Sequence, residues 1–325
     1  SKTGKQLWQN PIAPYYRNTM GHGPRATPTI AGDKVLVFTG EGILAALEFA
    51  SGKTIWKHDV FADAGSKPAQ YGTACSPLVI GELVVVTVGS PSETMVAYDI
   101  MTGQKKWGAG SDPAGYSSPA ILDVGGQKQL VALTGNSLLG LHPKTGKALW
   151  RYPYVTAYRC NTATPLAVDG KVFISAGENH GSVLLSVRAE NGVFELSEAW
   201  QSQGTRSVMR NEWQTSILLD GYLYGFDNVG SAGQVTHLTC IDAKSGKRAW
   251  QEPRFGKGNM IYADGKLFMS TMKGEVVIAQ ASPDGYEELG RKVVMDTTRQ
   301  APALANGLLY LRDGKQIICL DVRKK

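Results

Sequence analysis

The chain of 325 residues combines 42% apolar and 19% charged residues with 38 scattered glycines, which predicts a turn-rich globular protein with many short strands. No run approaches the roughly 18 consecutive apolar residues of a membrane span, and a net charge of +6 is too small an excess to indicate nucleic-acid binding. Four cysteines lie roughly eighty residues apart without a CxxC pair, which argues against a zinc or dithiol motif. This length is compatible with one all-β domain over residues 1–325.

A short motif, Gly-x-x-x-Trp after Thr or Ser, recurs along the chain. It ends at Trp8, Trp56, Trp107, Trp150 and Trp250. Trp200 follows Asn191-Gly192 through a longer turn, and Leu289 stands at the tryptophan position after Asp284-Gly285. The tryptophans are about 43 to 51 residues apart, which is the length of one four-stranded propeller blade with its loops.

The text between the tryptophans repeats as well. A Ser/Thr-Pro step opens most repeats, and a tight turn and an apolar strand follow it. The turns are Gly32-Asp33, Gly81-Glu82, Gly125-Gly126, Asp169-Gly170, Asp220-Gly221, Asp264-Gly265 and Asn306-Gly307. These residue types tolerate positive φ, so they predict hairpins. Each repeat is therefore four strands, named a to d, with the tryptophan on strand d.

The two ends of the chain complement each other. The last repeat stops at Val322, where its own Thr-Gly-x-x-x-Trp should follow, and the chain begins with that piece, Thr3 to Trp8. We therefore expect an all-β, seven-bladed β-propeller of four-stranded antiparallel blades in which the N-terminal strand closes the last blade. The alternative is an eight-bladed parent whose first blade is missing.

The repeat that runs from Ala97-Tyr98-Asp99 through Thr102-Gly103 to Trp107 resembles the tryptophan-docking motif of pyrroloquinoline-quinone-type propellers, and the likeness covers essentially the whole chain. That family includes quinoprotein alcohol and glucose dehydrogenases, the propeller lipoprotein of the outer-membrane barrel-assembly machinery, and many exported bacterial propellers. The resemblance implies the propeller fold and a periplasmic or otherwise exported protein, whose signal segment is not part of this sequence. It implies activity only weakly. The dehydrogenases carry a vicinal disulfide against the quinone, whereas no two cysteines are neighbours here.

The docking position accounts for six of the seven tryptophans, because a flat ring there fills the wedge between blades. Trp213 breaks this pattern. Irregular d–a loops and b–c hairpins emerge on one face, where binding usually occurs. The candidate binding residues on it are Arg25, Tyr158, Arg159, Arg210, Trp213, Arg299, His22 and His180.

Arginine holds carboxylate or phosphate in a bidentate fork, and arginine and tyrosine are also favoured at protein interfaces. We therefore expect a protein partner or an anionic small molecule at this face, and no nucleic acid. The alternative is that the arginines pair with Glu178, Glu212, Asp227 or loop carbonyls and only hold the loops together.

Catalytic motifs are mostly missing, since the sequence has no P-loop, HExxH, GxSxG or strand-to-helix GxGxxG. We expect a monomeric, non-catalytic propeller without a cofactor. One alternative is a quinoprotein oxidoreductase acting on alcohols or sugars, with pyrroloquinoline quinone and a calcium ion held by Glu178, Asn179, Asn211 and Glu212. The other is a carbohydrate-active enzyme that uses His22, His180 and Tyr158 for acid–base chemistry.

Overall fold

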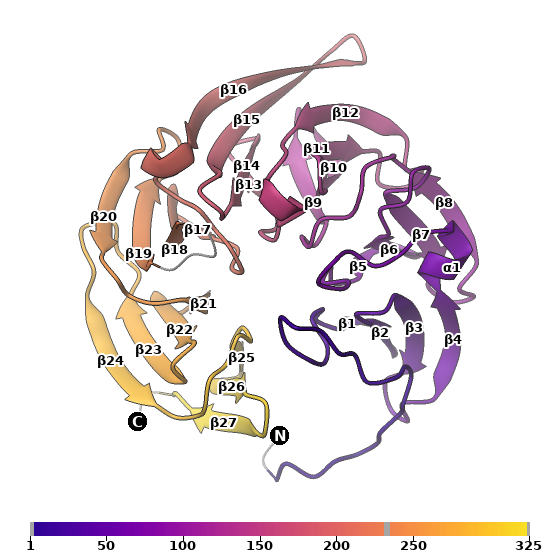
Figure 1. Ribbon diagram of the computed structural model, residues 1–325, viewed down its shortest axis with the longest axis horizontal. Helices are drawn as coiled ribbons and strands as arrows, with labels where there is room; N and C mark the ends of the chain where they lie inside the picture. The colour runs from indigo at the N-terminus through magenta and orange to yellow at the C-terminus, as the bar shows by residue number, and fades with distance from the viewer. Residues whose placement is uncertain (1–2, 231–234, 324–325) are drawn as a thin grey trace. The chain divides into compact units, whose positions relative to one another are not determined.

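The computed structural model describes residues 3–230 and 235–323. They form an all-β, seven-bladed propeller, and the ribbon of Figure 1 passes through the blades in chain order. Every sheet is antiparallel and every strand pairs with its neighbour in sequence, so each blade is a meander. Six sheets have four strands and the last has three. The repeat length in the sequence thus predicted the fold correctly.

The strands of the first three blades are β1 (Thr29–Ala31), β2 (Lys34–Phe38), β3 (Ile43–Glu48), β4 (Thr54–Asp59), β5 (Leu78–Ile80), β6 (Leu83–Thr87), β7 (Met95–Asp99), β8 (Lys105–Ala109), β9 (Ala120–Val124), β10 (Gln127–Leu133), β11 (Ser137–Leu141) and β12 (Ala148–Pro153). The fourth blade contains β13 (Leu166–Val168), β14 (Lys171–Ala176), β15 (Gly181–Glu190) and β16 (Val193–Gln203). The last three contain β17 (Ile217–Leu219), β18 (Tyr222–Val229), β19 (Val235–Asp242), β20 (Arg248–Glu252), β21 (Gly258–Ala263), β22 (Lys266–Thr271), β23 (Glu275–Gln280), β24 (Glu288–Val293), β25 (Ala303–Ala305), β26 (Leu308–Arg312) and β27 (Ile317–Asp321).

In the described part of the chain, three short helical elements interrupt the loops: α1 (Val60–Ala64), η1 (Ala157–Arg159) and η2 (Gly204–Arg206). Within the described ranges, no helix has the length and apolar character needed to cross a bilayer. The chain divides into two compact units. The N-terminal unit comprises residues 3–172 and 186–197, and the C-terminal unit comprises the described parts of 173–185 and 198–323. A single domain over residues 1–325 stays a prediction.

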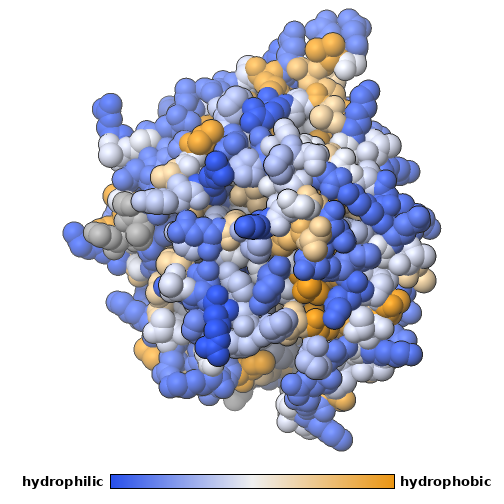
Figure 2. All heavy atoms as spheres, turned by 45° about the vertical axis from the view of Figure 1, so that its right-hand side comes forward, coloured by the Kyte–Doolittle hydropathy of each residue, from blue (hydrophilic) through white to orange (hydrophobic). Residues whose placement is uncertain are grey.

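The predicted hairpin turns are confirmed. In each blade two residues join the first strand to the second, and at least the glycine of each pair has positive φ. The outer strands are solvated, since all six residues of β24 are exposed, whereas β11 is buried along its whole length. The face shown in Figure 2 is mostly hydrophilic, with apolar residues in small groups.

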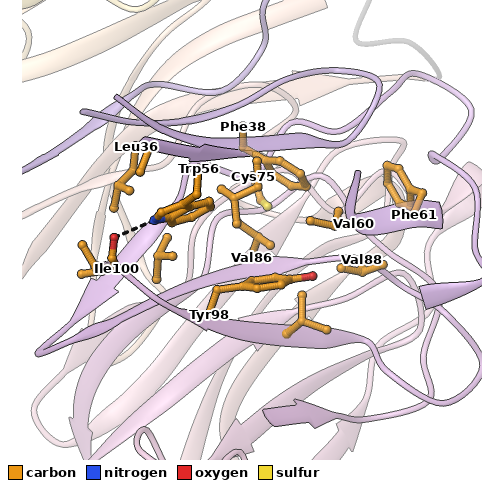
Figure 3. Close-up of a cluster of buried hydrophobic side chains, with 14 residues drawn as sticks. Leu36, Phe38, Trp56, Val60, Phe61, Cys75, Val86, Val88, Tyr98 and Ile100 are labelled. Atoms are coloured by element: carbon orange, nitrogen blue, oxygen red, sulfur yellow. Dashed lines mark hydrogen bonds between the residues drawn. The ribbon is translucent and has the colours of Figure 1, made fainter. Parts of the chain in front are cut away.

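The tryptophans of the repeat join neighbouring blades. Trp56 of β4 is 9% exposed, packs among Leu36, Val86 and Tyr98, and donates its indole N–H to the carbonyl of Ile100 at 2.8 Å (Figure 3). A Cβ added to Gly103 would lie 2.8 Å from this ring, so glycine makes room for it. Trp8, Trp200 and Trp250 also donate to main-chain carbonyls, those of Phe49, Ala243 and Ser282.

Two docking tryptophans depart from this pattern. Trp150 donates to the side-chain oxygen of Gln129, which belongs to the same blade, at 2.6 Å. The ring of Trp107 lies against Gly146, but its buried N–H has no hydrogen-bond partner among residues 3–230 and 235–323. Trp107 therefore docks on the next blade through ring packing without this hydrogen bond, while the hydrogen bond of Trp150 stays within its own blade.

In five blades the pairing of strands c and d skips one residue of strand d, and in four of them this β-bulge directly precedes the tryptophan. Small residues, Ala46, Ala97, Gly140 and Cys240, pair directly with the four tryptophans. In the sixth blade the bulged residue is Leu289, and Gly290 takes the tryptophan position opposite Ile278. Our assignment of Leu289 to that position is thus one residue off, because the preceding turn is longer.

The seventh blade also differs from expectation. Residues 3–28 contain no strand, so the N-terminal segment does not supply a fourth strand to the sheet of β25, β26 and β27. The segment is instead fastened to the first blade by side chains. Trp8 donates to Phe49, and the Asn10 amide donates to the Gly52 carbonyl at 2.7 Å and to Thr54.

Candidate functional site

Trp213 lies between two cations in the C-terminal unit. The ammonium of Lys257 is 4.4 Å and the guanidinium carbon of Arg299 4.8 Å from the centre of its half-buried ring. Glu212 forms an ion pair with Lys257 at 2.8 Å, which offsets part of the repulsion between the cations. The three loops involved precede β17, β21 and β25, the first strands of successive blades. We call these four residues the Trp213 cluster.

The cluster is held by buried contacts beneath it. Asn259, which is 7% exposed, donates to the Arg299 carbonyl at 3.0 Å, and the Ser270 hydroxyl donates to the Gln300 carbonyl. The Arg299 side chain is exposed, and the indole N–H of Trp213 has no hydrogen-bond partner in the described part of the chain. The arrangement therefore presents a rigid ring and a cation to solvent.

Arg210 has a different environment. Its guanidinium forms a bidentate pair with Asp227, with nitrogen–oxygen distances of 2.6 and 2.7 Å, and also donates to the Thr205 carbonyl. The Arg210 side chain is 4% and that of Asp227 0% exposed. Arg210 therefore lies inside its loop and not on a ligand-facing surface, as the alternative of internal arginine–carboxylate pairs anticipates.

His180 belongs to the hairpin between β14 and β15. Glu178 and Asn179 both have positive φ there, and the His180 N–H donates to the Gly177 carbonyl. Burial lowers the pKa of His180, so the ring is neutral at physiological pH. The hairpin supports the neighbouring blade, since the Asn179 side chain accepts from the Gly230 N–H at 2.9 Å.

The residues considered for calcium do not form an oxygen cage. The side-chain oxygen of Asn211 accepts from Ser216, that of Asn179 accepts from Gly230, and Glu212 pairs with Lys257. Within residues 3–230 and 235–323, no three His, Cys, Asp or Glu side chains are grouped so as to hold a metal ion. These side chains do not fit a calcium-bound quinone, and we derive no chemistry through one.

In the N-terminal unit, Arg25 fixes the long loop before β1. It stacks on Tyr16 at 4.9 Å and donates to the carbonyls of Tyr71 and Gly21. Tyr16 in turn fills space that Gly40 and Gly72 leave open. His22 is exposed on the same loop, where its Nδ1 accepts from the Asn18 N–H and its ring lies 5.9 Å from Tyr15.

Tyr158 and Arg159 are neighbours in η1, and both are exposed and have positive φ. They line a cavity of about 620 Å³ in the N-terminal unit, together with Lys67, Tyr116 and Asn136. The wall of this cavity is bonded to the loop that precedes β5, because the Tyr116 hydroxyl accepts a hydrogen bond from the Tyr71 N–H.

The structure therefore groups some predicted residues and separates others. Trp213 lies with Arg299, and Tyr158 with Arg159, while Arg25 and His22 share one loop. Sequence reasoning missed the stacking of Lys257 on Trp213 and the part that Lys67 and Asn136 take in the cavity. Lys257 could have been found from its position just before a first strand, as for Arg299, whereas Lys67 and Asn136 carry no such signal.

Comparison with known proteins gives a family match and several similar proteins. The family model described as outer membrane protein assembly factor BamB matches residues 1–252. BamB of Yersinia pestis is 21% identical over 293 residues, which is 89% of this chain and 71% of that protein. BamB of Moranella endobia is 22% identical over 296 residues, which is 88% of this chain and 72% of that protein.

Solved structures agree on the fold. The crystal structure of BamB from Moraxella catarrhalis has a TM-score of 0.67 at 16% identity, covering 96% of this chain and 84% of that one. A quinohemoprotein alcohol dehydrogenase from Comamonas testosteroni has a TM-score of 0.65 at 15% identity, covering 88% and 62%. At such identities the likeness shows a shared fold and not a shared activity.

Proposed function

Because this chain belongs to the family of outer membrane protein assembly factor BamB, we propose that it is an exported, non-catalytic assembly factor that binds protein partners through its d–a and b–c loops. The family match carries the proposal, and the irregular loops on a rigid all-β scaffold support it. The periplasm is the compartment in which a factor for outer-membrane proteins would act.

We place the main partner contact at the Trp213 cluster. Tryptophan and arginine are the residue types most enriched among the few that dominate binding energy at interfaces. The ring is already held between Lys257 and Arg299, so little conformational freedom remains to be lost on binding. The exposed cation beside it favours a partner surface that carries carboxylates.

Complementation tests this proposal in the organism from which the chain derives. Cells lacking the gene should contain less outer-membrane protein, and the wild-type chain should restore it. Trp213→Ala and Arg299→Ala should restore it poorly although both proteins accumulate normally. Lys292→Ala is the matched control, because Lys292 is an exposed cation of β24 outside the cluster. Full restoration by Trp213→Ala would exclude the cluster, and unchanged outer-membrane protein in the gene deletion would exclude the assembly function.

A further inference from the structure

The cavity lined by Tyr158 and Arg159 has the properties of a ligand site. Its volume of about 620 Å³ falls in the range of roughly 300 to 1,000 Å³ that small-molecule sites occupy. Its walls come from five separate segments of the N-terminal unit, which are residues 67–70, Gly89, residues from 113 to 116, Asn136, and residues from 155 to 159. Tyr116 is anchored in this lining, because it is 8% exposed and its N–H donates to the carbonyl of Asn161.

The charged groups of the lining are both cations. Lys67 and Arg159 form no ion pair within the described ranges, and the lining contains no carboxylate. The Asn136 side-chain amide likewise has no hydrogen-bond partner there. Burial raises the pKa of Tyr116 to about 12, so its phenol keeps a proton to donate while the oxygen accepts from Tyr71. Two cations and a phenol without an opposing acid are suited to a negative charge.

A buried carboxylate stabilises the loops behind the cavity without neutralising it. Asp112, 5% exposed, accepts hydrogen bonds from Thr134 at 3.0 Å and from Ser137, and pairs with Arg151 at 2.9 Å. The negative charge of Asp112 is therefore compensated by these partners, and Asp112 is not part of the cavity lining. The next residue, Pro113, lines the cavity and accepts from the Gly135 N–H at 2.8 Å, which fixes the loop in place.

The backbone at Tyr158 and Arg159 is unfavourable for these residues. Successive left-handed residues occur in tight turns, where asparagine, aspartate and glycine are preferred. The other non-glycine residues with positive φ are mostly Asp or Asn, as at Asp169, Asp220 and Asp264. In the described ranges, the only adjacent positive-φ pair without Asp, Asn or Gly is Tyr158-Arg159. Strain of this kind is retained where a side chain has a function beyond stability.

Room for the Arg159 stem comes from a glycine. A Cβ added to Gly135 would lie 3.1 Å from the Arg159 Cδ and 3.0 Å from the Ala114 carbonyl oxygen. The Arg159 side chain, which lines the cavity, therefore passes close to Gly135 at its Cδ. The apolar surface beside it, from Val155 and Pro68, suits a ligand with an uncharged part.

From these observations we propose that the cavity binds an organic anion, whose carboxylate or phosphate lies against Arg159 and Lys67 and whose apolar part lies along Tyr116 and Tyr158. This site belongs to the N-terminal unit and stands independently of the partner contact at Trp213. The site would recognise either a small molecule or the C-terminal carboxylate of a peptide, in a protein whose family is named for assembly.

Calorimetric titration of the full chain tests the proposal with N-acetyltyrosine, its uncharged amide, phenyl phosphate, and the free acid of acetyl-Ala-Ala-Tyr. At least one anion should bind at millimolar concentration and the amide should not. Stronger binding of phenyl phosphate would identify a phosphate ligand, and stronger binding of the tripeptide acid would identify a chain end. Equal binding of acid and amide, or no binding by any anion, would overturn the proposal.

Variants locate the site. Arg159→Gln and Lys67→Gln should each weaken binding about tenfold, since each removes one charge-assisted contact. Lys128→Gln, an exposed cation of β10 outside the lining, should leave affinity unchanged. The double variant Tyr158→Asn/Arg159→Gly should unfold at a higher temperature and lose binding. Undiminished affinity in Arg159→Gln and in the double variant, both shown to be folded, would overturn the site.

Discussion

Trp56 lies against Gly103 with its N–H bonded to the Ile100 carbonyl, whereas Trp213 lies between Lys257 and Arg299 with its N–H unbonded in the described ranges. The surroundings decide what each ring does. A tryptophan that packs on a glycine and donates to a carbonyl is part of the core. A tryptophan whose ring contacts two cations at the surface is available to bind another molecule. The same residue type therefore stabilises the fold in one region and serves binding in another.

The largest expected difference comes from removing each ring. Trp56→Ala should lower the free energy of unfolding by about 3 to 5 kcal/mol, because it leaves a cavity between blades. Trp213→Ala should lower it by about 1 kcal/mol, which is the scale of a partly exposed cation–π contact. Chemical denaturation of both variants measures the contrast, and similar losses for the two would remove the distinction between the regions.

Two arginines of the C-terminal unit, one buried and one exposed, offer a second contrast. Arg210→Met should cost about 3 to 5 kcal/mol, because it leaves the fully buried Asp227 carboxylate without a partner. Arg299→Ala should change stability by less than about 1 kcal/mol, since its side chain is exposed. The double variant Arg210→Met/Asp227→Leu should recover part of the loss. A single Arg210→Met as stable as the wild type would contradict a structural role.

Asp112 gives a pH-dependent test. Burial opposes its ionisation, but hydrogen bonds from Arg151, Ser137 and Thr134 outweigh this and lower its pKa. A carboxyl with a lowered pKa stabilises the fold fully above its ordinary pKa of about 3.9, and this contribution disappears as the pH falls through the folded value. Asp112→Asn should therefore lose about 1.5 to 3 kcal/mol at neutral pH.

Denaturation of the wild type and Asp112→Asn over a pH series measures this effect. The two curves should approach each other as the pH falls below the ordinary pKa of an aspartate, and should converge only below the lowered pKa of Asp112, where the wild-type carboxyl is also neutral. A difference that stays constant from neutral to acid pH would mean that shape, and not charge, makes Asp112 necessary.

The smallest expected effect concerns two glycines with positive φ. Gly32→Ala meets open space, so it should cost only the conformational penalty of about 1 kcal/mol. Gly103→Ala meets the same penalty and also places a Cβ 2.8 Å from the Trp56 ring, so it should be more destabilising. Equal melting temperatures for the two variants would argue against docking of Trp56 on Gly103.

Local patterns predicted the blades, because turns at residues such as Asp169-Gly170 and the spacing of the tryptophans depend on neighbouring residues alone. Contacts between distant residues escaped prediction. Arg210 and Arg299 occur in similar loops, and only the approach of Asp227, on the following strand pair, separates the buried arginine from the exposed one.

The dependence on contacts between distant residues also explains why the prediction that an N-terminal strand closes the last blade was wrong. The motif identified Trp8, but it did not show how the N-terminal segment is held. The side chains of Trp8 and Asn10 bond to the first blade, and the segment forms no strand. The cavity beside Arg159 is formed by several loops that are distant in sequence. Their approach depends on Gly89, Gly115 and Gly135, where an added Cβ would meet main-chain atoms within 3.1 Å.

Affinity capture tests the central claim, that the Trp213 cluster contacts a protein partner, most directly. Tagged wild type, Trp213→Ala and Lys292→Ala would be recovered from detergent-solubilised envelopes of the native organism, and the retained proteins quantified by mass spectrometry. We predict that the wild type and Lys292→Ala retain an outer-membrane assembly protein that Trp213→Ala loses. Equal retention by all three proteins would contradict the account.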